Sequence, residues 1–160
     1  VGVTVAVAIS PDNRFAIFAG DVQTAGVDEL FRAPLAPLRL DFDGDDLVRA
    51  DTDLLLFTRY LAGFRGTALT TGALGGSATI TDPTTIANAI AATLTGPTAL
   101  VLDIDSDTRK LPTTDALLLL RYQLGLRSTA LVNGVLGTGA TVTNPATIES
   151  RIQAVLTAIQ

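Results

Sequence analysis

Two periodicities of apolar residues divide the chain. Over residues 1–9, β-branched residues occupy every second position and small or polar residues lie between them. This period of two predicts a β-strand, and residues 15–18 fit a return strand after a turn at residues 11–14. Further along, apolar residues recur at every third or fourth position, as at Ile86 and Ile90, which predicts amphipathic helices. The pattern therefore predicts an N-terminal β segment followed by a helical region.

An internal repeat organises the helical region. Residues 41–95 recur at an offset of 62 positions, so that Asp41 matches Asp103, and about half of the aligned residues are identical. A similarity of this length indicates two copies of one unit. The predicted organisation is an N-terminal β segment and linker at residues 1–39, a first copy at residues 40–99 and a second copy at residues 100–160.

The sequence of each copy predicts a loop followed by two helices. In the first copy, Thr52 or Asp53 can begin the first helix and Gly63 can end it. Asp82 and Pro83 begin the second helix, because an Asx cap before a proline at the first helical position is a strong start signal. The second copy repeats these signals at Thr114 or Asp115, at Gly125, and at Asn144 and Pro145.

The expected fold class is α+β. It combines two mainly helical loop-helix units with the N-terminal β-strand or hairpin segment. Short apolar runs at residues 38–40 and 100–102 predict a further strand ahead of each loop.

Aspartates gather in the two loops that begin the copies. Each loop carries the pattern D-x-D-x-D, followed by an aspartate eight residues later at a helix start. Alternate carboxylates in a tight loop converge on one point, and Ca²⁺ takes about six to eight oxygen ligands. Without a cation the like charges would repel, so the repeated spacing predicts two Ca²⁺ sites. The pattern comprises Asp41, Asp43, Asp45 and Asp53 in the first copy and Asp103, Asp105, Asp107 and Asp115 in the second.

The stretches DFDGDDLVRADTDLLLFTRYLAG and DIDSDTRKLPTTDALLLLRYQLG resemble the duplicated calcium loop-helix units of dockerin domains, in a bacterial variant. The similarity covers residues 41–63 and 103–125 and includes the acidic spacing, the Thr-Asp helix start, the leucine run, the Arg-Tyr pair and the closing glycine. It implies that the eight aspartates are side-chain ligands of Ca²⁺. By analogy with the family's loop, the mid-loop carbonyls would come from Leu47 and Arg109.

Three features depart from the dockerin pattern. The closing aspartate comes one residue later than in the family's loop, and the usual loop glycine is replaced by Asp46 in one copy and Thr108 in the other. The copies also lie farther apart and each contains an additional helix. Binding to a cohesin-like partner therefore remains an alternative and is not inherited from the resemblance.

The composition excludes much of enzyme chemistry. The 160 residues include no His and no Cys, which excludes histidine and thiol catalysis and disulfides. The paired carboxylates could imitate a glycosidase, but the chain has no Trp and only two Tyr to stack on a sugar, so a hydrolase is the least favoured hypothesis. A net charge of −5 argues against a nucleic-acid partner, and no apolar run is long enough for a membrane span.

The remaining hypotheses concern assembly and binding. Hydrophobic residues make up 48% of the chain and charged residues 17%, which is little charge to cover its own surface. Together with the N-terminal strand, this predicts a non-enzymatic, secreted calcium-binding protein that assembles with copies of itself into an extracellular filament or surface layer. Donation of that strand to the next copy is one route to assembly. The alternative for the strand is an ordinary hairpin packed on its own domain. A start at Val1 without Met fits a processed secreted protein, although an excised fragment would begin in the same way. The alternative is a dockerin-type adaptor.

Overall fold

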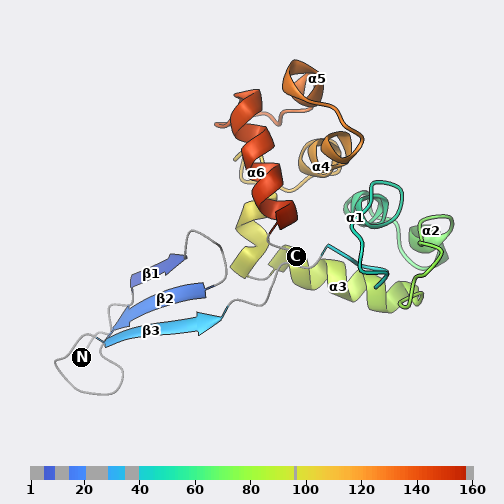
Figure 1. Cartoon of the computed structure of the whole chain (residues 1–160), viewed down its shortest axis with the longest axis horizontal. Helices are drawn as coiled ribbons and strands as arrows, with labels where there is room; N and C mark the ends of the chain where they lie inside the picture. The colour runs from blue at the N-terminus through green and yellow to red at the C-terminus, as the bar shows by residue number, and fades with distance from the viewer. Residues whose placement is uncertain (1–5, 10–14, 21–28, 35–39, 96, 158–160) are drawn as a thin grey trace. The chain divides into compact units, whose positions relative to one another are not determined.

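The computed structural model describes residues 6–9, 15–20, 29–34, 40–95 and 97–157. The chain divides into two compact units, Val1–Pro37 and Leu38–Gln160 (Figure 1). Both copies of the repeat thus belong to one unit.

The strands of the first unit form an antiparallel sheet. They are β1 (Ala6–Ile9), β2 (Phe15–Gly20) and β3 (Glu29–Pro34), and their order across the sheet is β1-β2-β3. In the register of β2 and β3, Phe18 is opposite Phe31. The predicted strand at residues 1–9 lies only in part within the described residues, and the predicted turn at residues 11–14 lies outside them.

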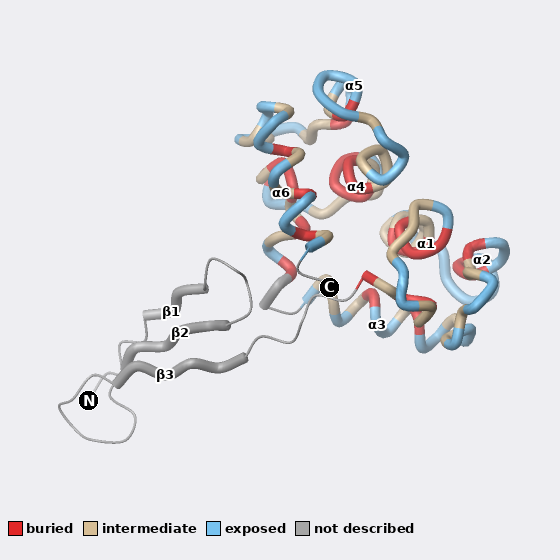
Figure 2. Tube along the Cα trace, in the orientation of Figure 1, coloured by how far each residue is buried: buried red, intermediate tan, exposed pale blue. Residues whose placement is uncertain are grey.

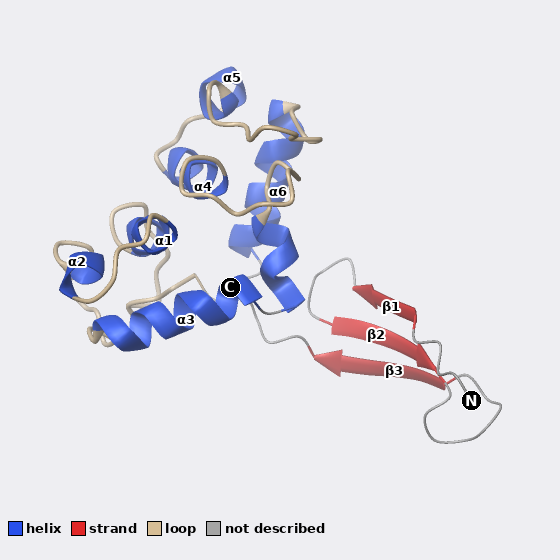
Figure 3. Cartoon of the chain, turned by 180° about the vertical axis from the view of Figure 1, so that it is seen from behind, coloured by secondary structure: helices blue, strands red, loops and turns tan. Residues whose placement is uncertain are grey.

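The expected α+β fold class is wrong. The described residues of the second unit, 40–95 and 97–157, form helices and contain no strand or sheet (Figure 3). Residues 100–102, expected as a strand, are the end of a 3-10 helix, η1 (Pro97–Leu102). Of the strand expected at residues 38–40, only Leu40 lies within the described residues, and it has no regular structure. A run of three apolar residues fits a helical turn as well as a strand, so its length could not decide between them. The N-terminal segment belongs to the separate first unit, much of which lies outside the described residues.

The two copies contain the same helices in the same order. The first copy has α1 (Asp53–Leu61), α2 (Thr67–Thr70) and α3 (Pro83–Thr95). The second copy has α4 (Asp115–Gln123), α5 (Ser128–Val132) and α6 (Pro145–Thr157). The two helices predicted in each copy are confirmed, whereas the short helices α2 and α5 were not predicted.

One apolar core runs through both copies, and Figure 2 shows its buried residues on the inner sides of the helices. In the first copy, the rings of Phe42 and Phe57 stack with their centroids 6.2 Å apart. In the second copy the matching positions hold Ile104 and Leu119, which are also fully buried. The aromatic pair and the aliphatic pair thus fill the same place between the acidic loop and the helix that follows it.

In each copy, an arginine of the first helix donates hydrogen bonds to carbonyl oxygens in and just after the short second helix. Arg59 Nη1 donates hydrogen bonds to the carbonyl oxygens of Leu69 at 3.0 Å and Thr71 at 2.8 Å. The guanidinium carbon of Arg65 lies 3.7 Å from the centre of the Tyr60 ring. The second copy repeats both contacts through Arg121, Arg127 and Tyr122. The Arg-Tyr pairs therefore serve helix packing.

The caps of α3 and α6 differ in one ionisable group. Asp82 Oδ2 accepts hydrogen bonds from Thr85 N at 2.7 Å and Thr85 Oγ1 at 2.8 Å, and these bonds lower the pKa of Asp82. In α6, Asn144 Oδ1 accepts hydrogen bonds from Ala146 N at 3.0 Å and Thr147 N at 3.3 Å. A lowered pKa means that the contribution of Asp82 to stability is present above its unfolded-state pKa and is lost as the pH falls through its folded-state pKa.

We expect both Asp82→Ala and Asn144→Ala to lower the melting temperature at pH 7, because each removes an N-cap. The effect of Asp82→Ala should shrink as the pH falls below the ordinary aspartate value of 3.8, while that of Asn144→Ala should persist. Thermal denaturation followed by circular dichroism at stepped pH measures both. An Asp82→Ala effect that is equally large in acid would contradict the assignment.

Candidate metal sites

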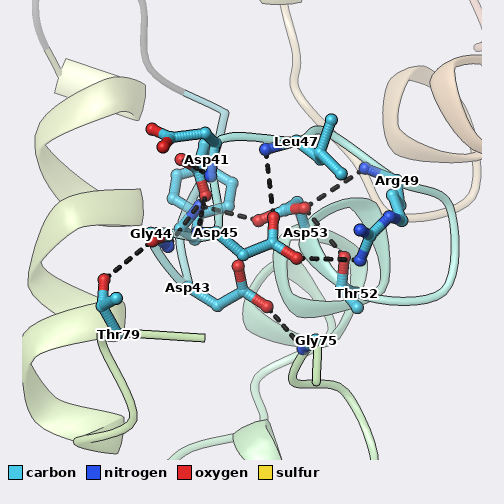
Figure 4. A network of polar contacts seen from close by, with 12 residues as sticks. Asp41, Asp43, Gly44, Asp45, Leu47, Arg49, Thr52, Asp53, Gly75 and Thr79 are labelled. Carbon is cyan, nitrogen blue, oxygen red and sulfur yellow. Dashed lines mark hydrogen bonds and ion pairs between the residues drawn. The ribbon is translucent and has the colours of Figure 1, made fainter. Parts of the chain in front are cut away.

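The first acidic loop closes through hydrogen bonds from its own backbone to its first aspartate (Figure 4). Asp41 Oδ1 accepts hydrogen bonds from Gly44 N at 2.8 Å and Asp45 N at 3.2 Å, and Asp41 Oδ2 accepts one from Asp46 N at 3.0 Å. These bonds fold the chain around the Asp41 carboxylate. As a result, the carboxylates of Asp43 and Asp45 lie close to that of Asp41.

Asp46 and Thr108 adopt a backbone conformation that favours glycine. Asp46 has a φ of 64° and Thr108 a φ of 73°, both in the left-handed region that favours glycine. A residue with a Cβ pays about 1–2 kcal/mol for this conformation. In each loop the amide of the strained residue donates to the first aspartate, Asp46 N to Asp41 Oδ2 and Thr108 N to Asp103 Oδ2. Both loops therefore keep the tight turn despite the substitution.

The first loop brings four carboxylates together. One carboxylate oxygen from each of Asp41, Asp43, Asp45 and Asp53 lies within 4.8 Å of the others. Asp53 reaches this group from the first residue of α1, where its Oδ1 accepts a hydrogen bond from Phe42 N at 2.7 Å. The four aspartates predicted from the spacing thus form one group that could hold a metal ion.

Asp43 has one carboxylate oxygen without a protein partner. Its side chain is fully buried, and its Oδ2 accepts a hydrogen bond from Gly75 N at 2.6 Å. Its Oδ1 is also buried and has no hydrogen-bond partner within the described part of the chain. Leaving a buried polar group unpaired costs about 1–3 kcal/mol, and more for a charged one. A cation among the four carboxylates would satisfy this oxygen.

The aspartate at the start of the first helix has a raised pKa in both copies. Burial raises the pKa of Asp53, although hydrogen bonds from Phe42 and Thr52 oppose the shift and the charge of Asp43 adds to it. Burial likewise raises the pKa of Asp115 in the second copy. Burial therefore disfavours the ionised forms of Asp53 and Asp115, which a positive charge close by would favour.

The second loop groups three of its four predicted aspartates. Carboxylate oxygens of Asp103, Asp105 and Asp115 lie within 4.8 Å of one another. Asp107 is not in this group, and its Oδ1 accepts a hydrogen bond from Arg109 N at 2.8 Å. Asp107 nevertheless stays in the loop and is nearly buried. Two groups of aspartates that could hold a metal ion are therefore present, and they differ in composition.

The predicted carbonyl ligands lie in the same loops. Leu47 N donates a hydrogen bond to Asp45 Oδ1 at 3.0 Å, which matches the bond from Arg109 N to Asp107 in the second copy. Both residues thus lie next to the third aspartate of their loop. That their carbonyl oxygens bind a cation stays a prediction.

Two glycines outside the loops contact the carboxylates and were not predicted as site residues. Gly75 N donates to Asp43 Oδ2, and Gly137 N donates to Asp105 Oδ2 at 2.6 Å. A Cβ on Gly75 would collide with the carboxylate of Asp45, and a Cβ on Gly137 with that of Asp107. A signal was present in the sequence, because both copies keep this glycine while the next residue changes from Gly76 to Thr138.

Comparison with known proteins gives no family assignment. No protein-family model, curated protein or solved structure matches the chain. Over the described residues, none of the helices has the length and apolar character needed to cross a membrane. The acidic groups are therefore the feature from which function can be argued.

The close approach of the glycines gives a steric test. We expect Gly75→Ala and Gly137→Ala each to lower the free energy of unfolding by about 1–3 kcal/mol, because the new methyl group must displace a carboxylate. Gly76→Ala is the matched control, since a Cβ there meets no atom within 4 Å. Urea denaturation compares the three variants. If Gly75→Ala is as stable as Gly76→Ala, the contact does not constrain the loop.

Proposed function

We propose that the chain is a non-enzymatic calcium-binding module in which each acidic loop binds one Ca²⁺ ion. The observation that carries this proposal is Asp43 Oδ1, a buried carboxylate oxygen without a donor, in a group of four aspartates. The resemblance to the calcium loops of dockerin domains supports the same proposal.

The chemistry of the ligands favours calcium over other metals. The groups consist of carboxylates, and the chain has no His or Cys to select zinc or copper. Ca²⁺ accepts an irregular shell of carboxylate and carbonyl oxygens, whereas Mg²⁺ requires near-ideal octahedral geometry and usually keeps several waters. An irregular loop with many carboxylates therefore suits Ca²⁺ best.

Calcium in the first loop would join three parts of the copy. Asp41, Asp43 and Asp45 come from the loop itself, and Asp53 comes from α1. Gly75 follows α2 in the chain and is attached to Asp43 through its amide, and Thr79 N donates to the Asp43 carbonyl at 2.9 Å. An ion among the carboxylates would therefore stabilise the contacts that hold these parts together.

We expect calcium to stabilise the folded chain because the ion binds the native loops better than the unfolded ones. A chelator should lower the melting temperature, and free Ca²⁺ at one hundred times the dissociation constant should add about 2.7 kcal/mol per site. Asp43→Asn and Asp105→Asn should each remove one contribution. Differential scanning calorimetry with chelator, CaCl₂ or MgCl₂ measures these effects.

Asp51→Asn is the control, because Asp51 is exposed in the first loop and lies outside the group of four. Its response to calcium should equal that of the unmodified chain. A melting temperature that chelator and CaCl₂ leave unchanged would contradict the proposed function.

We also propose that the calcium-loaded chain assembles with copies of itself as an extracellular structural element. Low charge content supports this, and so do the large apolar side chains that remain exposed on the helical unit. These side chains are Leu47, Phe64, Leu100 and Leu124. The alternative is an adaptor that is monomeric in isolation and binds a cohesin-like partner.

The mass of the purified chain in solution separates these alternatives. We expect size-exclusion chromatography with light scattering to show oligomers in CaCl₂ and a shift toward monomer in chelator, because rigid loops present a fixed surface. The double variant Leu100→Ser and Leu124→Ser should weaken assembly. A monomer at high concentration with calcium would contradict self-assembly and favour the adaptor.

A further inference from the structure

The two acidic loops differ in one charged contact. Arg49 Nη1 lies 2.8 Å from Asp45 Oδ2, and the side chain of Asp45 is fully buried while that of Arg49 is 39% exposed. The matching position in the second copy is Leu111, which carries no charge. Of the described residues, Arg49 alone forms an ion pair with an aspartate of either loop.

We propose that Arg49 is a built-in competitor of the cation, so that the first site binds Ca²⁺ more weakly than the second and fills after it. This inference rests on the proposed calcium function. Arg49 would exert this effect through its ion pair with Asp45 and would not itself contact the cation.

The guanidinium weakens the first site in two ways. It occupies Asp45 Oδ2, an oxygen that a cation would otherwise use. Its own positive charge then repels a divalent cation placed among the carboxylates. Partial exposure of Arg49 allows salt to screen this repulsion.

The backbone amides of residues 49 and 111 make the same contact. Arg49 N donates to Asp53 Oδ2 at 3.2 Å, and Leu111 N donates to Asp115 Oδ2 at 3.1 Å. The charge is therefore the main difference at this position.

The second loop contains Arg109 and Lys110 and has Arg151 nearby, and over the described residues none of the three forms an ion pair with an aspartate of that loop. Arg151 Nη1 donates to the carbonyl of Ile104 at 3.1 Å and to Ser106 Oγ at 2.6 Å, and to no carboxylate. Among the described residues, no basic side chain therefore occupies a carboxylate oxygen of the second loop as Arg49 does in the first.

The number of grouped carboxylates alone would give the opposite order of affinity. The first loop groups four aspartates and the second groups three, so the first site would bind more tightly if only carboxylates mattered. The order of filling therefore distinguishes the effect of Arg49 from that of carboxylate number.

The test uses the full chain with one site removed at a time. Asp105→Asn leaves the first site, and Asp43→Asn leaves the second, so that titration with CaCl₂ in a calorimeter reads one dissociation constant in each. We expect the first site to be the weaker one. Adding Arg49→Leu to the first-site variant should tighten it on the order of tenfold at low salt.

Two further variants control for packing. Arg49→Lys keeps the charge and should give no comparable gain, whereas Leu111→Arg in the second-site variant should weaken binding by a similar factor. The gain in affinity from Arg49→Leu should fade at high ionic strength, which a purely structural role would not cause.

The outcomes separate this inference from the proposed function. If both single-site variants bind calcium but Arg49→Leu leaves the dissociation constant unchanged or weaker, the role of Arg49 is overturned and the calcium function stands. If neither the unmodified chain nor any variant binds calcium, the proposed function itself fails. If Arg49→Leu does not fold by circular dichroism, Leu111→Arg decides, and unchanged binding there overturns the inference.

Discussion

Carboxylates that the fold buries impose the main constraint on the helical unit. Asp43 and Asp53 in the first copy, and Asp105 and Asp115 in the second, are each without exposed surface. Like charges repel strongly in such surroundings, so each needs donors or a cation. The loop backbone donates amides from Phe42 and Arg49 to Asp53, and the turn at Gly75 donates one to Asp43. Even so, Asp43 Oδ1 is left over, and this remaining oxygen is the structural argument for a bound ion.

The sequence predicted the features that depend on local spacing. The aspartates of each loop lie within thirteen residues, so their spacing was enough to place seven of the eight in a group. The Asx-Pro signals at Asp82 and Asn144 likewise placed the starts of α3 and α6. The amides of Gly75 and Gly137 could not be placed in the same way, because each reaches a carboxylate 32 residues away. The α+β class failed where short apolar runs fit a helical turn equally well.

The duplication allows the first copy of the repeat to be compared with the second. Both copies keep the loop turn, the contact of a glycine amide with an aspartate, and the arginine hydrogen bonds between the first two helices. Phe42 and Phe57 of the first copy are replaced by Ile104 and Leu119 in the second. Packing between the loop and the helix thus tolerates a change of side-chain shape. The charges in the loops have changed as well. Arg49 is replaced by Leu111, while Leu47 and Val48 are replaced by Arg109 and Lys110. One backbone arrangement therefore carries two electrostatic environments, which is why the two sites are expected to differ.

The most direct test of a calcium site in the first loop is a crystal structure of the full chain grown with CaCl₂. An ion should lie about 2.3–2.6 Å from Asp43 Oδ1, with oxygens of Asp41, Asp45 and Asp53 completing part of its shell. Anomalous scattering can confirm its identity. A first loop without an ion, in which Asp43 Oδ1 accepts a hydrogen bond from a protein donor or a water, would contradict the assignment.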